Sequence, residues 1–514
     1  MGWKKKCIKP DRVLRRIKPG MRIFLGTGVS EPQTLVKQLM ASSSSEINDL
    51  ELIQLVSYGH ASSPKAIHAR KFRLRTFFSG FVSRAITSGR VDLIPVRFAR
   101  IPHLFQKGLI HVDAAFVQIS PPDPSGYCSF GVSVDVARLA MEQASLTVGE
   151  INSDIPVTFG DTFVHVSEFD FLVQSTEKPI YFERWPVDAT FDKLAAQIVS
   201  LIEDRSCISF SIGPLFEALS GYLKKRKHLG IHSPIFTDAL MELVQSGAVS
   251  NRYKGTYLGK SLASYAFGSA KLFDWLHKNP MVEFQSIEQV FDPMKIGLND
   301  NFVAIIPARK VDLCGRIILH SGVGNVATGP IELLDFFKGA EISHGGRSIF
   351  GLPSRNREGK PNIRISVSKY HNQFGSEESV DIVVTEYGAA NLKGLTIRER
   401  AQSLIDIAHP EDRQLLVEQA KRKKMLYPDQ IFIPESSFLY PEYIAEKHVF
   451  KGGLEVRFRP IRPSDEEQMR RLFYRFPDQD VYARYFANIQ SMPHAKMQEY
   501  VNVNWNETMS VVGM

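Results

Sequence analysis

The chain has 514 residues, 44% of them hydrophobic and 23% charged, which is the composition of a globular protein with about two to four domains. The 63 basic and 55 acidic residues leave a net charge of +8. The basic residues form short, separate clusters that do not resemble a nucleic-acid-binding module. Four scattered cysteines, no signal-peptide core and no apolar run of about 18 residues argue against a disulfide framework and a membrane span, so we expect a cytoplasmic protein.

The first predicted segment, residues 8–185, alternates between strand and helix patterns. Ser30 is a candidate cap for the first of its longer helices, with Pro32 near the first turn. The alternation predicts a parallel sheet with helices on both faces. Strands are predicted at 21–25, 91–95, 114–119 and 146–148, and helices at 32–40 and 133–144.

The second predicted segment, residues 190–430, repeats this style, and two α/β domains in tandem favour a ligand cleft between them. A proline-containing linker separates it from a short third segment, residues 454–514, which is expected to hold a strand at 455–459 and a helix at 469–476. In the second segment, helices are predicted at 192–202, 216–225 and 398–407, and strands at 206–212, 302–306, 348–352, 363–368 and 382–386.

Several short motifs follow one another in a fixed order along residues 1 to about 430. Together they resemble the acetyl-CoA hydrolase and 4-hydroxybutyrate CoA-transferase family. The resemblance implies an α/β fold with two tandem open parallel-sheet CoA-transferase-type domains. The motifs are SPPD at 120–123, GYCSFGVS at 126–133, GDTFVHVSEFD at 160–170, HLGIHSPIFTD at 228–238 and VTEYG at 384–388.

The resemblance also implies a mechanism, and this chain departs from it at one residue. In the family a glutamate in the sequence HLGIH[ST]EM attacks the acyl-CoA carbonyl, which gives a mixed anhydride and free CoA thiolate. The thiolate then forms a glutamyl-CoA thioester that an incoming carboxylate resolves. This chain has Pro234 at the position of that glutamate. The implied ligands are CoA or acyl-CoA and a small carboxylate, with no permanently bound cofactor and no metal, and a homo-oligomer is left open.

A second departure lies in the glycine-rich loop, SGVGGQVDFxRGA in much of the family. It aligns with residues 328–340, where Gly329 stands but Ile331 to Leu333 would crowd a ligand that approaches the backbone. The neighbouring Gly322, Gly324 and Asn325 are a candidate substitute loop. With Gly388 of the VTEYG motif, these glycines and Asn325 are our predicted CoA-binding residues.

Other side chains are weighed as replacements for the missing nucleophile. Glu332 lies in the altered loop, and the alternative is a carboxylate that stabilises a helix N-terminus. Glu386 ends a predicted strand, and the alternative is a hydrogen-bonded structural carboxylate. His232 beside Ser233 resembles a base next to a hydroxyl, but neighbours in an extended segment face opposite sides. Cys128 is more typical of a small buried packing residue than of a nucleophile.

Residues 456–465 resemble the first strand and turn of a GNAT acetyltransferase, and the acetyl-CoA pyrophosphate loop of that family does not occur before Met514. Three readings of the function therefore stay open. The chain is an acyl-CoA:carboxylate CoA-transferase or acyl-CoA hydrolase with an unrecognised nucleophile, a non-catalytic CoA-binding or regulatory protein, or a scaffold for an acetyltransferase domain.

Overall fold

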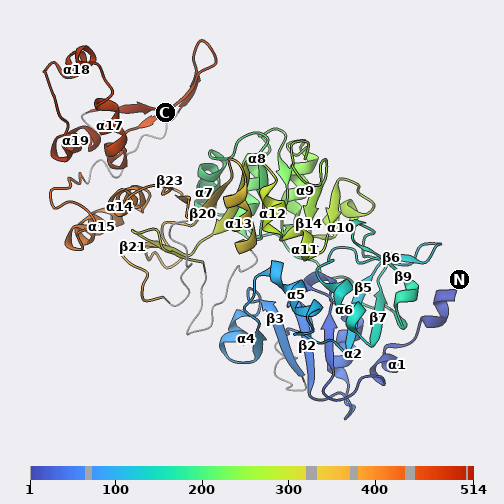
Figure 1. The fold of residues 1–514 in the computed structure, drawn as a ribbon. Helices are drawn as coiled ribbons and strands as arrows, with labels where there is room; N and C mark the ends of the chain where they lie inside the picture. Colours follow the sequence, from blue (N-terminus) through green and yellow to red (C-terminus); the bar gives the residue numbers. More distant parts are fainter. Residues whose placement is uncertain (1, 64–71, 320–332, 371–379, 434–445, 505–507) are drawn as a thin grey trace. The chain divides into compact units, whose positions relative to one another are not determined.

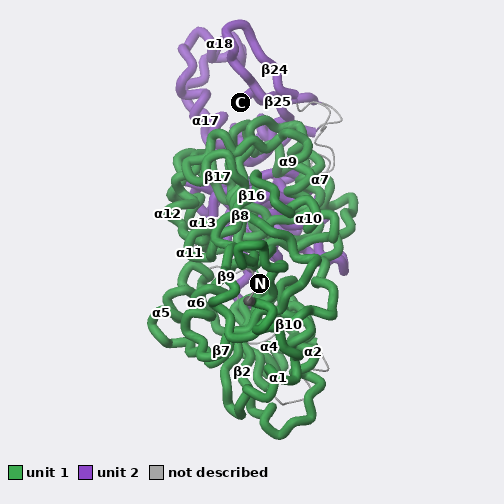
Figure 2. Tube along the Cα trace, turned by 90° about the vertical axis from the view of Figure 1, so that its right-hand side faces the viewer, with its two compact units in different colours: residues 1–307, 319–349 green, residues 308–318, 350–514 purple. Residues whose placement is uncertain are grey.

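The computed structural model describes residues 2–63, 72–319, 333–370, 380–433, 446–504 and 508–514. The chain forms two compact units (Figure 2): unit 1 holds Met1–Pro307 and Leu319–Ile349, and unit 2 holds Ala308–Ile318 and Phe350–Met514. The predicted fold class is confirmed, because both α-helices and parallel β-sheets build the chain. The predicted boundary between 185 and 190 falls inside unit 1.

The largest element of unit 1 is a seven-stranded sheet in which every pairing is parallel (Figure 1). The strands predicted at 21–25, 91–95, 114–119 and 146–148 all belong to it. In spatial order the strands are β10 (Phe171–Gln174), β7 (Leu146–Ile151), β5 (Ala114–Ile119), β1 (Arg22–Leu25), β2 (Leu50–Val56), β3 (Phe72–Phe78) and β4 (Val91–Leu93).

Alternation along the central strand β1 explains why helices cover both faces of this sheet. Ile23 and Leu25 join one apolar cluster with side chains of α1 (Pro10–Leu14) and α2 (Gln33–Ala41). Phe24 points the other way and meets Phe105 of α5 (Ile101–Gln106) edge to face, with ring centroids 6.4 Å apart. A strand buried on both faces reads as a continuous apolar run, as residues 23–25 do.

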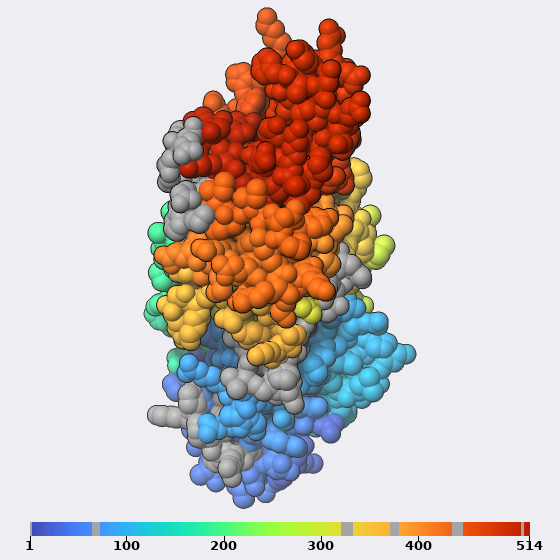
Figure 3. Space-filling view, turned by 90° about the vertical axis from the view of Figure 1, so that its left-hand side faces the viewer, coloured from blue at the N-terminus to red at the C-terminus, as the bar shows by residue number. Residues whose placement is uncertain are grey.

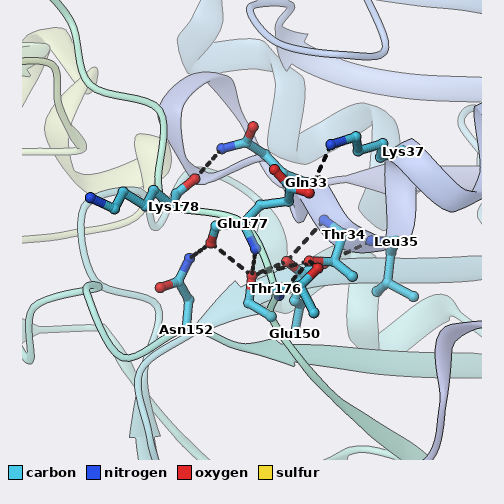
Figure 4. Close-up of polar contacts among 10 residues, drawn as sticks. Gln33, Thr34, Leu35, Lys37, Glu150, Asn152, Thr176, Glu177 and Lys178 are labelled. Atoms are coloured by element: carbon cyan, nitrogen blue, oxygen red, sulfur yellow. Dashed lines mark hydrogen bonds and ion pairs between the residues drawn. The ribbon is translucent and has the colours of Figure 1, made fainter.

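Helix α2 begins at a carboxylate from a distant strand (Figure 4). Glu150 of β7 accepts hydrogen bonds from the backbone N–H groups of Thr34 and Leu35, at 3.0 and 2.9 Å, and from the Ser175 hydroxyl at 2.7 Å. A buried carboxylate there satisfies free N–H groups and complements the helix dipole. The prediction that Ser30 caps this helix is wrong, because the N-cap residue is Pro32 and no side chain from that position caps it.

The remainder of unit 1 builds several smaller sheets, and one of them draws on a distant part of the chain. β8 (Phe159–Gly160) pairs in parallel with β16 (Val282–Phe284), which pairs with β14 (Ser261–Ala263). The other strands are β11 (Cys207–Ser209) between β12 (Gly230–Ile231) and β17 (Phe302–Pro307), all parallel; β13 (Ile235–Phe236) with β15 (Tyr265–Ala266); and β6 (Tyr127–Ser129) with β9 (Phe163–His165).

The helices of unit 1 pack around these sheets, and those predicted at 133–144, 192–202 and 216–225 are present with shifted ends. The remaining helices of unit 1 are α4 (Ser83–Thr87), α6 (Ala137–Gln143), α7 (Ala189–Val199), α8 (Pro214–Leu223), α9 (Asp238–Gln245), α10 (Ala270–Leu276), α11 (Ile287–Val290), α12 (Pro293–Gly297) and α13 (Leu333–Ile342).

Unit 2 contains short strands, two packed helices and a C-terminal part with its own apolar core, drawn in red in Figure 3. That core includes Phe473, Met492, Met497 and Val501. The elements are β18 (Lys310–Asp312), β19 (Ile317–Ile318), β21 (Ile363–Arg364), β22 (Ile382–Thr385), β23 (Gly388–Asn391), α14 (Ile397–Asp406), α15 (Pro410–Arg422), β24 (Glu446–Val449), β25 (Glu455–Pro460), α17 (Glu466–Phe473), α18 (Asp478–Tyr485), α19 (His494–Val501) and β26 (Val511–Gly513); β20 (Arg347–Gly351) runs from unit 1 into unit 2.

Within the described ranges we find no helix with the length and apolar character of a membrane span.

We expect Gly160→Ala to destabilise unit 1 strongly. Gly160 has φ +110°, and a Cβ atom built there would lie 2.1 Å from the backbone oxygen of Phe284 in the neighbouring strand. Backbone cannot give way as a flexible side chain can, so β8 would separate from β16. Gly247→Ala is the matched control, because Gly247 also has a positive φ, +81°, but no atom lies within 4 Å of its added Cβ.

Thermal unfolding of the two variants measures the difference. The control should lose about 1–2 kcal/mol from backbone strain alone, and Gly160→Ala should lose clearly more. If the two variants lose the same free energy of unfolding, the close contact with Phe284 does not contribute to the destabilisation.

Candidate functional site

The chain passes from one sheet to another around Pro234. β12 ends at Ile231 in the parallel sheet with β11, and β13 begins at Ile235 beside β15. Pro234 lies between them, and its carbonyl accepts hydrogen bonds from the N–H groups of Ser264 and Tyr265 at 3.2 and 3.3 Å. A proline has no N–H group to satisfy. The residue is buried, and its carbonyl makes these two hydrogen bonds.

Pro234 lines an apolar pocket inside unit 1, the Pro234 pocket, which encloses about 370 Å³ of space, part of it open to solvent. In this conformation the lining side chains leave room for little more than a water molecule. Among the lining residues only Ser211 and Tyr265 carry a polar side-chain atom. The lining consists of Val56, Phe78, Phe81, Phe98, Ser211, Ile212, Pro234, Ile235, Tyr265, Phe267 and Phe291.

The neighbouring Ser233 is fully engaged by the backbone around it. Its hydroxyl lies 2.9 Å from the carbonyl oxygens of both Phe210 and Ile235, which share its single proton, and it accepts from the Phe210 N–H at 3.0 Å. A hydroxyl in this environment stabilises the bend between β12 and β13. It is not presented to a substrate.

His232 is fully buried, and both of its ring nitrogens have partners. Nε2 lies 2.8 Å from the Val290 carbonyl oxygen, and Nδ1 lies 3.3 Å from the Asn299 amide nitrogen. The carbonyl requires a proton on Nε2, so Nδ1 accepts from the amide. Burial, with a smaller contribution from Lys254, lowers the pKa of His232 to about 3. The imidazole is therefore neutral and structural, and it does not activate Ser233.

The structure places two further predicted site residues in unit 2. Glu386 follows β22, and its two oxygens accept hydrogen bonds from the Ser354 hydroxyl at 2.6 Å and the Ser354 N–H at 2.8 Å. Gly388 begins β23 with φ +140°, and a Cβ built on it would lie 2.9 Å from Nη1 of Arg462. Glu386 and Gly388 thus lie together, and Pro234 belongs to unit 1.

The predicted residues Gly322, Gly324, Asn325, Gly329 and Glu332 lie outside the described residues. Cys128 is described and fully buried, and burial raises the pKa of its thiol to about 12, so it is an inert packing residue at neutral pH. In the part of the chain that the structure describes, no group of three or more His, Cys, Asp or Glu side chains could hold a metal ion.

Sequence reasoning missed the aromatic lining of the Pro234 pocket. Phe78 ends β3 and Phe81 follows it closely, but the pattern at 72–78 was not predicted as a strand. A signal was present, because FRLRTFF alternates before it ends in paired aromatics. Phe98, Phe267 and Phe291 carry no local signal, since only the fold brings them to Pro234.

We expect His232 to make stability depend on acidic pH. The folded-state pKa is depressed from its ordinary value near 6.5, so the stabilisation is complete above pH 6.5 and is lost as the pH falls toward 3. At pH 5 the loss is about 2 kcal/mol. His232→Gln removes this titration and should flatten the decline between pH 7 and pH 5.

The control is His103→Gln, which changes an exposed histidine. Urea unfolding at pH 7, 6 and 5 compares the three proteins. Burial also raises the pKa of Glu31 to about 7 and of Asp135 to about 6, but those contributions are common to all three and cancel in the differences. Parallel pH profiles for wild type and His232→Gln would show that His232 is not buried and neutral.

Comparison with known proteins identifies the family. Residues 1–183 match the acetyl-CoA hydrolase/transferase N-terminal domain, and residues 268–420 match the acetyl-CoA hydrolase/transferase C-terminal domain. The 4-hydroxybutyrate coenzyme A transferase of Clostridium kluyveri is 36% identical over 423 residues, which is 82% of this chain and 98% of that protein.

Solved structures agree with the sequence relatives. RipA from Yersinia pestis superposes with a TM-score of 0.75 at 27% identity, and a 4-hydroxybutyrate CoA-transferase from Porphyromonas gingivalis with a TM-score of 0.69 at 28% identity. Each alignment covers 82% of this chain and 98% of the other. The family domains, the sequence relatives and the shared fold lead to one conclusion: this chain belongs to the acetyl-CoA hydrolase/transferase family.

Proposed function

We propose that this chain binds CoA or an acyl-CoA on a CoA-transferase fold and does not form a glutamyl-CoA thioester at the family position. The observation that carries this proposal is the Pro234 pocket. None of the side chains that line it carries a carboxylate, thiol or imidazole. The proline ring has no lone pair with which to attack a thioester, and the hydroxyl of Ser233 beside it is held by backbone groups.

The expected ligands are CoA or an acyl-CoA and a small carboxylate, with no permanently bound cofactor. Affinity for CoA should be weak, since Ile331 to Leu333 replace the small residues of the family's glycine-rich loop. A non-catalytic or regulatory role follows from this reading.

A second candidate keeps the family activity, acyl-CoA:carboxylate CoA transfer or acyl-CoA hydrolysis. The observation that favours it is the extent of the likeness, which reaches 98% of the length of a curated CoA transferase. In this reading Glu332 or Glu386 supplies the carboxylate. A third candidate, a scaffold for an acetyltransferase domain, rests on the GNAT-like sequence of residues 454–514 alone.

A trapping experiment separates the first two candidates. The protein is incubated with acetyl-CoA or butyryl-CoA and treated with borohydride or hydroxylamine, and the adduct is located by mass spectrometry of peptides. We expect no acyl-CoA-dependent adduct, and no exchange of CoA onto added acetate. An adduct on Glu332 or Glu386 would establish the second candidate. Titration calorimetry with CoA completes the test: sub-micromolar affinity contradicts weak binding, and no binding at millimolar CoA favours the scaffold.

We expect Pro234→Glu not to restore full family activity. The introduced carboxylate would enter an apolar pocket, so burial would raise its pKa above the ordinary value near 4.3. A nucleophile about 1 Å from its productive position loses roughly 100-fold in rate. Acyl exchange should stay far below that of an ordinary family member in the same assay.

Pro234→Gln is the matched control for this variant, because it has the same shape as Glu and no charge. A raised folded-state pKa means that the cost of Pro234→Glu appears as the pH rises through the range between the two pKa values. The melting temperature of Pro234→Glu should therefore fall below that of Pro234→Gln at pH 8 and match it near pH 4. A difference that does not change with pH would show that the pocket solvates the carboxylate.

A further inference from the structure

Six aromatic side chains of unit 1 form a connected group, the ring cluster: Tyr58, Phe78, Phe81, Phe182, Trp185 and Phe267. Phe81 is at its centre. Its ring centroid lies 4.7 Å from that of Tyr58, 5.8 Å from Phe78, 5.9 Å from Phe182 and 6.3 Å from Phe267. These separations are those of rings in direct contact.

The ring cluster forms part of the lining of two adjoining pockets. Phe78, Phe81 and Phe267 line the Pro234 pocket. Phe182, Trp185 and Phe267 line a second one, the Arg184 pocket, which encloses about 290 Å³. The two pockets share Ser211, Ile212 and Phe267. A continuous aromatic surface therefore runs from the position of the family nucleophile toward Trp185.

Exposure of the rings increases outward along this surface. Phe98 and Phe291 at the inner end of the Pro234 pocket are 1% and 0% exposed. Phe78, Phe81, Phe182 and Tyr58 are partly exposed, and Trp185 is 41% exposed. Covering such rings with an apolar group is favourable, because apolar surface leaves water. The outer rings are in contact with solvent and the inner rings are not, so we expect the pocket to admit a ligand by rotation of the outer rings.

The polarity of the lining decides which ligand fits. A hydroxyl placed in the Pro234 pocket would find only the side chains of Ser211 and Tyr265 as polar neighbours, and a buried polar group without a partner is costly. Arg184, at the rim of the second pocket, already pairs with Glu217 and Glu242. Arg184 is the only cation among the lining residues of the two pockets, so the lining offers no free cation to an anionic group and much surface to an apolar one.

We propose that the Pro234 pocket and the ring cluster select acyl groups with a bulky apolar body, aromatic or alicyclic best, over acetyl and hydroxyacyl groups. This specificity rests on the proposed function for the CoA part of the ligand. Phe81 is its main determinant, because it contacts four other rings and lines the Pro234 pocket.

The test is a calorimetric series with acetyl-, butyryl-, hexanoyl-, 4-hydroxybutyryl- and benzoyl-CoA on the whole chain. Affinity should rise about three- to fourfold for each added methylene, benzoyl-CoA should bind at least about tenfold more tightly than acetyl-CoA, and 4-hydroxybutyryl-CoA should bind more weakly than butyryl-CoA. Equal affinities across the series would overturn the proposal.

Two variants test the role of Phe81. Phe81→Ala should lose roughly tenfold in affinity for benzoyl-CoA and less than about twofold for acetyl-CoA. Phe81→Leu keeps an apolar side chain and should lose the preference for benzoyl over hexanoyl, and it serves if the alanine variant does not fold. Tyr482→Ala, which removes a ring that is 55% exposed on α18, should leave the series unchanged. A uniform loss for every acyl group in both Phe81 variants would overturn the role of Phe81.

Free carboxylates separate this inference from the proposed function. If benzoate binds more tightly than acetate while CoA does not bind at all, the result supports the proposed acyl specificity and contradicts the proposed CoA binding. If CoA and every acyl-CoA bind equally well, the result supports the proposed CoA binding and contradicts the proposed acyl specificity.

Discussion

Desolvation is the constraint on which the site around Pro234 depends. Where the chain passes from β12 to β13, water is excluded from every polar side chain, and each one is satisfied by a fixed neighbour. The Ser233 hydroxyl is hydrogen-bonded to the backbone of Phe210 and Ile235. Both ring nitrogens of His232 are hydrogen-bonded as well, one to the Val290 carbonyl and one to the Asn299 amide. A proline is compatible with this environment because it brings no N–H group and no charge. A reactive carboxylate is not, unless its solvation is replaced.

The strands of the seven-stranded sheet could be predicted from the sequence where they consist mostly of apolar residues. Residues 114–119 were predicted with the correct bounds, because that strand is buried along its whole length. β2 was not predicted, although it lies in the same sheet, because Glu51 and Gln54 interrupt its apolar pattern, and β3 was not predicted although its alternation is a strand signal. These polar residues have partners that only the fold supplies: Arg75 pairs with Glu51 across the two strands, and Gln54 donates to the Gly26 carbonyl.

The sequence singled out Pro234 as a site residue, but it did not predict the aromatic lining of the pocket around it. The order of the motifs directs attention to Pro234 without any structure. The aromatic residues of the lining range from Phe78 to Phe291 in the sequence, and no local sequence pattern predicts that they come together. The start of α2 is a similar case: a search near the helix selects Ser30, whereas Glu150 reaches the same N–H groups from another strand. Local sequence rules consider only capping residues close to the helix, whereas in the folded chain a distant segment can supply the cap.

The pairing of β8 with β16 has a consequence for the order of events during synthesis. Phe159 and Gly160 leave the ribosome well before Val282 to Phe284, the strand on which they finally lie. At about 5–20 residues per second, the gap between them lasts roughly ten seconds. Once Gln174 has been made, every strand of the seven-stranded sheet is present, but β8 still lacks β16 and presents an unpaired strand edge. Throughout that interval the nascent chain therefore carries an unpaired strand edge that is open to misassembly.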